Sequence, residues 1–179
     1  MSVTYRRIVT GHDAKGCSII EIDGGPGAVL GGKRSGLQEF WAENGAPADN
    51  SRPGDPTQAP ITLETAPMGS KFRFFSVMPR DPAMSLDELE KTTAAGFEIM
   101  QASHCRVDTT RDVSMHKTRS LDYVIVLQGE VTLLLDASEV DLKPFDVVVQ
   151  RGTNHGWIAK GDKPALMAGI LIDALPLEK

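Results

Sequence analysis

The sequence predicts an all-β protein, built as a sandwich or closed barrel, with one helical insertion. Short apolar segments separated by Gly, Asp, Ser and Pro fill its C-terminal third: 124–127, 131–135, 147–150 and 166–172. Closely spaced short strands with turn residues between them are typical of antiparallel sandwiches and barrels. We therefore expect residues from about 112 to 173 to form most of a closed antiparallel barrel, whose sheets the N-terminal strands complete or extend.

The N-terminal part contains further strand signals. Two apolar runs around a polar HDAKG turn predict a hairpin within residues 5–22. The glycine-rich segment 24–36 lacks both GxGxxG and GxxxxGK[ST], and no helix signal follows it, so we interpret it as a flexible connection rather than a phosphate-binding loop. A short strand is expected at 37–41 and an aromatic, β-branched strand at 71–78. Between them, residues 44–60 are rich in Pro, Asn, Asp, Gly and Ser and predict a long surface loop.

One helix is expected around residues 85–102. Ser85 and Glu88 form an S-x-x-E capping box, in which each side chain accepts a hydrogen bond from a backbone N–H at the other position. Four apolar residues then fall roughly on one helical face: Leu86, Leu89, Phe97 and Met100. Gly96 weakens the middle of this segment, so the helix is expected to be broken or in two pieces.

Composition limits the class of protein and of partner. The 179 residues suit one domain, and the net charge of −5 offers no basic surface to nucleic acid or to an anionic membrane. No apolar segment approaches the ~20 residues of a membrane helix, and the N-terminus lacks the apolar core of a signal peptide. We therefore expect a cytoplasmic protein acting on a small molecule, with Cys17 and Cys105 as free thiols in a reducing compartment.

Residues 115–129 read MHKTRSLDYVIVLQG. This segment resembles the first cupin motif, a His-x-His followed by a Glu and then by a Gly seven residues after that Glu. His116 occupies the first histidine position and Thr118 the second. Asp122 stands at the glutamate position, and Gly129 lies at the distance that the motif requires.

Residues 145–157 read FDVVVQRGTNHGW and resemble the second cupin motif, whose histidine closes the metal site. Asp146 and Gly152 match this motif, and His155 occupies the histidine position. A proline usual in the motif is missing, and the motif is one residue shorter. The resemblance in 115–173 implies a double-stranded β-helix, the cupin or jelly-roll barrel.

The phrases RRIVTGHD, MHKTRSLDY and VVVQRGTNHGW are similar to one branch of small cupins found in bacteria and in fungal metabolite clusters. Some members of that branch are called oxidoreductases. The resemblance implies a single cupin domain over residues 1–179, with N-terminal strands and loops in 1–111 and the motif region in 112–173. Because cupins of this size commonly form dimers, we expect a homodimer in which residues 5–22 pack on the partner.

The motif residues could converge on one site. Along a strand alternate side chains face the same side, so His116, Thr118 and Asp122 could all point inward, where His155 meets them. Two imidazoles and a carboxylate match non-haem iron sites. We expect a divalent metal on His116, Asp122 and His155: iron first, with manganese, nickel or zinc as alternatives. A metal-free pocket stays open as a reading, because Thr118 is a poor ligand and Asp122 is shorter than glutamate.

Other residues could bind the substrate. Arg151, beside the second motif, could pair with a substrate carboxylate, although a salt bridge within the protein is the ordinary role. Trp157 and Tyr123 could form a platform for the substrate or simply pack in the barrel. His104 follows the helix and could reach the barrel mouth as a further ligand or a proton carrier.

Three functions are compatible with these residues. The first is a metal-dependent oxidoreductase, such as a dioxygenase, acting on a small oxygenated organic metabolite, with His116, Thr118, Asp122 and His155 as catalytic residues. The second is a lyase, dehydratase or decarboxylase that uses Lewis-acid or general acid–base chemistry. The third is a small-molecule-binding barrel without catalytic activity.

Overall fold

The computed structural model describes residues 5–32 and 35–176, and within them each strand pairing is antiparallel. No helix in these ranges is long and apolar enough to cross a membrane. The elements in chain order are β1 (Arg7–His12), β2 (Ser18–Gly24), β3 (Ala28–Gly32), β4 (Ser35–Glu43), β5 (Ser70–Val77), α1 (Leu86–Ile99), the short 3-10 helix η1 (Ser103–Cys105), β6 (Ser120–Gln128), β7 (Val131–Leu135), β8 (Glu139–Leu142), β9 (Val147–Arg151), β10 (His155–Ala159) and β11 (Ala165–Asp173).

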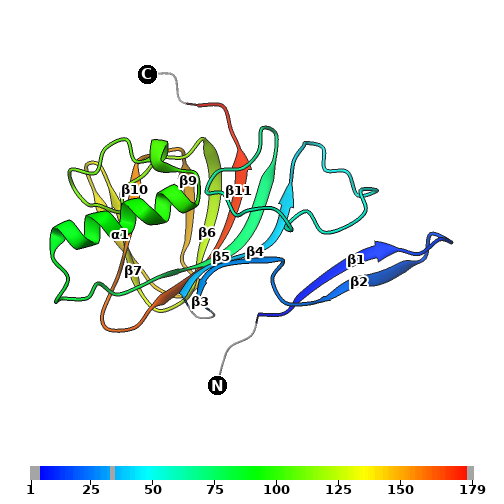
Figure 1. Ribbon diagram of the computed structural model, residues 1–179, viewed down its shortest axis with the longest axis horizontal. Coiled ribbons are helices and arrows are strands. Elements are labelled where there is room, and N and C mark those ends of the chain that lie inside the picture. Colours follow the sequence, from blue (N-terminus) through cyan, green and yellow to red (C-terminus); the bar gives the residue numbers. More distant parts are fainter. Residues whose placement is uncertain (1–4, 33–34, 177–179) are drawn as a thin grey trace.

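Two sheets form the body of the molecule (Figure 1). The smaller has the strand order β10-β7-β8, and the larger has the order β3-β4-β5-β11-β6-β9. Their main core cluster joins apolar side chains of both sheets: Val124, Val126, Val131, Leu133, Leu142, Ala165 and Met167. Residues 112–173 supply the whole smaller sheet and three strands of the larger one, and β3, β4 and β5 extend the latter. The predicted all-β barrel is confirmed.

The glycine-rich segment is more ordered than the sequence indicates. The segment is not a flexible connection, since β3 pairs with the first half of β4 as a hairpin. In this pairing Val29 lies opposite Gln38, and Leu30 lies opposite Leu37. Gly36 has a φ of 109°, and a Cβ there would stand 2.1 Å from the Leu30 carbonyl oxygen, so glycine is required. The expectation for residues 33–34 lies outside the described residues. The short strand β8 was not predicted.

Helix α1 begins where the capping box predicts. The Ser85 hydroxyl accepts from the backbone N–H of Glu88, and the Glu88 carboxylate accepts from the backbone N–H of Ser85. The expected break at Gly96 is absent, since one continuous helix runs through it. The helix lies against one end of the barrel (Figure 1), and Phe97 is its buried side chain.

The predicted N-terminal hairpin is present as β1 and β2, but it stands apart from both sheets (Figure 1). Arg7 anchors it to the body. Its guanidinium pairs with Asp55 of the 44–60 loop at 2.5 Å and donates to the Phe40 carbonyl oxygen of β4 at 3.1 Å. We call residues 7–24 the arm.

Candidate functional site

Two histidines lie opposite each other at the heart of the site. The backbone N–H of His116 donates to the carbonyl of His155 at 2.8 Å, and the reverse bond measures 2.9 Å. Directly opposed residues of an antiparallel pair project to the same face, so the two rings lie together, with centroids 4.3 Å apart. The backbone pairing of two separate segments therefore fixes the imidazole pair.

The ring nitrogens of the pair are arranged in the same way. Nδ1 of His116 lies 2.9 Å from the Ser114 carbonyl oxygen, and Nδ1 of His155 lies 3.0 Å from that of Thr153. A carbonyl oxygen only accepts, so each Nδ1 carries the hydrogen and each neutral ring keeps a lone pair on Nε2. Burial lowers the pKa of both histidines; that of His155, which the neighbouring His116 lowers further, falls to about 3. Neutral imidazoles with a free Nε2 are in the form that binds metals.

Asp122, on β6, is a buried carboxyl group. Burial raises its pKa to about 6, against the opposing effects of a hydrogen bond from Ser120 and the charge of Arg73. Its Oδ1 has no hydrogen-bond partner among the described residues. The Ser120 hydroxyl also lies 2.8 Å from the Thr118 hydroxyl. Asp122 can therefore take up or release a proton close to neutral pH.

Arg73, on β5, is a buried cation that sequence reasoning missed. Its side chain is 2% exposed, and it pairs with the Glu39 carboxylate at 3.0 Å. It also donates to the carbonyl oxygens of Thr62 at 2.9 Å and Leu63 at 3.2 Å. Burial lowers the pKa of Arg73 and raises that of Glu39. The sequence alone held no signal for it, because Arg73 stands between Phe72 and Phe74 and only its pairing with Glu39 on β4 shows which face it takes.

These groups line a cavity of about 440 Å³, which residues of both sheets and of α1 enclose. Its polar lining comprises Arg73, Ser76, His116, Thr118, Asp122 and His155, and its apolar lining includes Leu37, Phe75, Phe97, Met100, Trp157 and Leu171. The His116 ring contacts Phe97 at a centroid distance of 5.0 Å, and the His155 ring contacts Trp157 at 5.7 Å. A cavity of this size and composition suits a small organic molecule.

Three residues that sequence analysis assigned to substrate binding do not line this cavity. Tyr123 follows Asp122 directly and so faces the opposite side of the sheet. Arg151 lines a separate, smaller depression on the edge of the large sheet. His104 is exposed and bonds the Glu64 carboxylate at 2.8 Å. Trp157, by contrast, does line the cavity.

The expected metal ligands share the cavity without meeting at one point. Across the described residues, the one group of three side chains whose possible ligand atoms all lie within 4.8 Å of one another is Glu64, His104 and Cys105, outside the cavity. His116, Asp122 and His155 do not form such a group. Burial raises the pKa of the Cys105 thiol to about 11. The two imidazole rings lie close together, with centroids 4.3 Å apart, but with Asp122 they do not make a set of three mutually close ligand atoms.

Comparison with known proteins agrees with this fold. The model of the "Cupin domain" family matches residues 104–172. "Phomopsin biosynthesis cluster protein C'" of Diaporthe leptostromiformis is 31% identical over 98% of this chain and 82% of its own length. The "Cupin-domain-containing oxidoreductase virC" of Hypocrea virens is 38% identical over 45% of each chain. The solved structure of a "Cupin 2 conserved barrel domain protein" from Salinispora arenicola covers 82% of each chain at 13% identity, with a TM-score of 0.41. The chain belongs to the cupin superfamily.

Proposed function

We propose that this cupin is a metal-dependent oxidoreductase that acts on a small oxygenated organic metabolite in the cavity. The observation that carries the proposal is the pair His116 and His155, whose Nδ1 hydrogens are both donated to backbone carbonyls and whose Nε2 lone pairs are free. A bound divalent metal would supply Lewis acidity and, as iron, redox chemistry with dioxygen. Relatives called cupin-domain-containing oxidoreductases support this class of reaction.

The two histidines of the cavity fit a metal ion, whereas its other polar residues are assigned different roles. The two imidazoles are neutral, buried and held by second hydrogen bonds, which is the usual state of histidine ligands. The Thr118 hydroxyl is engaged with Ser120, so we do not assign it as a ligand. Because Asp122 shares the cavity but not a common ligand group with the imidazoles, we assign it to proton transfer.

The lining of the cavity supports a substrate with an apolar skeleton and polar oxygen atoms. Its walls are mainly apolar and include Phe75, Phe97 and Trp157, so a ring or short hydrocarbon skeleton would lose water on binding. The polar groups would meet the oxygen atoms of the substrate. Arg73 would attract negative charge on such an oxygen, and Asp122 would accept or return the proton. Phenols and enolisable carbonyl compounds combine these features.

A lyase, dehydratase or decarboxylase is the second candidate. The observation in its favour is Asp122, since a carboxyl with a pKa of about 6 and an unpartnered Oδ1 suits general acid–base chemistry without any change of redox state. In that case the proton taken up by Asp122 would come from a carbon or hydroxyl group of the substrate. The buried Arg73 would stabilise the negative charge that develops.

Measuring the metal content of purified variants tests whether the imidazole pair binds a metal ion. We expect about one equivalent of a divalent metal in wild-type protein after purification or reconstitution, measured by elemental analysis. His155→Ala should lose it, and His104→Ala is the matched control, because it removes a histidine outside the cavity. Metal retained by His155→Ala but lost by His104→Ala would move the site to the Glu64, His104 and Cys105 group and contradict the proposal.

Oxygen consumption then separates the two candidate functions. Wild-type protein is supplied with phenolic and keto compounds under air, and product formation is compared with oxygen uptake. Uptake that matches product and disappears in His155→Ala supports the oxidoreductase. Product formed at the same rate without oxygen supports the lyase. In either case Asp122→Asn should lower kcat by roughly 100-fold, the usual contribution of a general acid or base.

A further inference from the structure

A depression of about 170 Å³ on the edge of the large sheet collects positive charge. Its lining comes from residues 117–121, from the end of β9 and from residues 174–176, which follow β11. Its charged residues are Lys117, Arg119 and Arg151, all of them cations. The chain as a whole has a net charge of −5, so this depression differs in sign from the protein around it.

Strand geometry explains why these cations lie together. Thr118 lines the cavity, so the alternation of side chains places its neighbours Lys117 and Arg119 on the other side of the segment. Leu121 follows Arg119 by two residues and shares its side. Arg151 lies directly opposite Leu121 in the pairing of β9 with β6, and directly opposed residues share a face.

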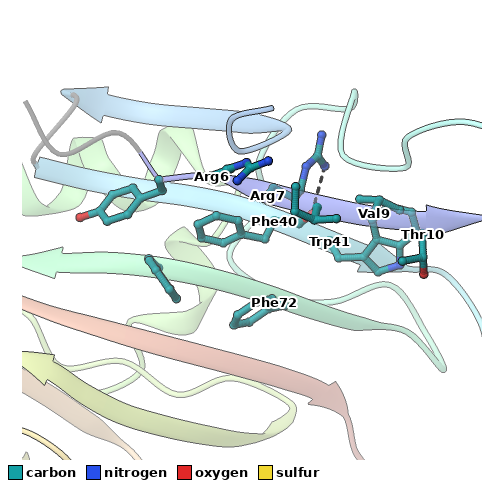
Figure 2. A pocket seen from close by; sticks show the side chains of 10 residues that line it. Arg6, Arg7, Val9, Thr10, Phe40, Trp41 and Phe72 are labelled. Carbon is teal, nitrogen blue, oxygen red and sulfur yellow. Dashed lines mark hydrogen bonds between the residues drawn. The ribbon is translucent and has the colours of Figure 1, made fainter. Parts of the chain in front are cut away.

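Elsewhere in the protein arginines are matched by acids. Salt bridges to Asp or Glu are formed by Arg6, Arg7, Arg73, Arg80, Arg106 and Arg111. Arg7 is an example in the larger groove of about 460 Å³ beside the arm. It pairs with Asp55 at 2.5 Å, and Figure 2 marks its hydrogen bond to the Phe40 carbonyl oxygen. The positive charge in that groove is therefore already neutralised.

The cations of the depression have no such partner. Among the described residues, Lys117, Arg119 and Arg151 form no salt bridge, although both arginines are exposed and Lys117 is half-buried. Glu64 accepts from the backbone N–H of Arg119 at 3.0 Å, but its other oxygen bonds His104 at 2.8 Å. Clustered like charges repel one another, so an anion that joins them would be bound favourably.

We propose that this depression binds a phosphate group, either free or as part of a small phosphomonoester. A guanidinium binds carboxylates and phosphates through two parallel hydrogen bonds. A carboxylate offers two oxygens and one charge, whereas a phosphomonoester offers three acceptor oxygens and close to two charges, which matches three cations better. Leu121 and Leu175 line the same depression, and Leu175 is 95% exposed. An organic group beside the phosphate would therefore gain apolar contacts.

Isothermal titration calorimetry with inorganic phosphate and with phenyl phosphate tests the site. The titrations are made at pH 8 and low ionic strength, because salt screens exposed charges. Wild-type protein should bind one equivalent. Arg119→Gln and Arg151→Gln should each raise the dissociation constant roughly 10-fold, as the loss of a charge-assisted hydrogen bond does. Arg52→Gln is the matched control, because Arg52 is exposed, forms no salt bridge among the described residues and lies outside the depression. It should leave the dissociation constant unchanged.

The two probes separate the two sources of phosphate. Tighter binding of phenyl phosphate than of inorganic phosphate would assign the depression to a phosphomonoester, and equal binding would assign it to the phosphate group alone. His155→Ala, which should lose the metal of the cavity, should bind both probes as wild-type protein does. The phosphate site can therefore stand or fall separately from the proposed metal.

Several results would overturn the proposal. One is wild-type protein that does not bind either probe below about 10 mM, an affinity too weak for a built site. Others are acetate bound as tightly as phosphate, Arg52→Gln weakening binding as much as Arg151→Gln, or binding lost in His155→Ala. Binding seen only after Glu178→Gln would assign the cations to a carboxylate of this chain instead. Circular dichroism checks each fold, and either arginine variant of the depression tests the site if the other fails to fold.

Discussion

Asp122 links the site to stability through its raised pKa. The folded pKa of about 6 lies above the ordinary value of about 3.9, so the folded state holds the proton more tightly than the unfolded chain. Its contribution is therefore fully present at low pH and is lost as pH rises through 6. In metal-free protein, Asp122→Asn should remove this loss and gain up to about 3 kcal/mol over wild type at pH 8.

Urea unfolding at pH 5 and pH 8 measures this effect. Wild-type protein should lose more stability between these values than the Asn variant does. Asp49→Asn is a control, since Asp49 is exposed and its pKa is lowered rather than raised. Parallel pH dependences in wild-type protein and Asp122→Asn would mean that the Asp122 carboxyl titrates normally.

The two free cysteines should differ in reactivity. Cys17 is exposed, whereas Cys105 is buried and has a pKa raised to about 11. Since the thiolate is the reactive form, Cys105 should react slowly. A disulfide reagent should titrate one thiol rapidly in the folded protein and two in urea, and Cys17→Ser should abolish the rapid phase. Rapid reaction in Cys17→Ser would show that the segment around Cys105 opens readily.

At the residue scale, spacing identified the histidines but not the whole cavity. His116 and His155 follow from motif positions that need no knowledge of the fold. Arg73 could not be found in this way, because an arginine flanked by phenylalanines on an isolated strand has no preferred side. Only the register with Glu39 on β4 shows that it faces inward.

Two glycines should respond in opposite ways when a methyl group is added. Gly96 lies within α1, and a Cβ there would meet nothing within 4 Å. Gly96→Ala should therefore stabilise the fold by about 0.5–1 kcal/mol. Gly129 has a φ of 77°, and its Cβ would stand 2.9 Å from the Pro164 carbonyl oxygen and the Ala165 Cα. Gly129→Ala should cost about 2 kcal/mol or more.

Thermal or urea unfolding measures both effects. Because Gly96 lines the cavity, its alanine variant should also raise KM while it raises stability. Loss of stability in Gly96→Ala would show that α1 is strained at this position. A neutral Gly129→Ala would mean that the turn after β6 shifts freely.

At the element scale, local signals predicted where most elements lie but not how each one ends. The capping box placed the start of α1, because its two hydrogen bonds involve neighbouring residues alone. The break expected at Gly96 is absent, since a helix packed against the barrel tolerates a glycine that would weaken an isolated one. β3 was missed because its pairing with β4 outweighs the flexibility of its glycines.

For the whole molecule, the Arg7–Asp55 pair is the main link between the arm and the body. Arg7 holds the pKa of Asp55 well below its usual range, so the pair stabilises the fold above about pH 4 and this contribution is lost as pH falls towards the folded pKa. Asp55→Asn leaves a buried guanidinium without its partner and should cost about 3 kcal/mol at pH 7.

Equilibrium unfolding at pH 7 tests this link, with Asp49→Asn as the control from the same loop. The control should cost less than about 0.5 kcal/mol, because Asp49 is exposed. The difference between wild type and Asp55→Asn should shrink at pH 3. A difference that grows on acidification would contradict the direction of the Asp55 shift.

Strand β5 has a consequence for how this sequence can change over time. Alternate residues of this strand lie in different environments. Arg73 and Phe75 face the cavity, and Phe72 and Phe74 face outward. Substitutions at one set can alter chemistry while the other set stays untouched. Inserting or deleting one residue would exchange the inward-facing and outward-facing sets. The arginine would then face outward, and a phenylalanine would face the cavity in its place. Insertions and deletions in β5 should therefore be tolerated far less than substitutions.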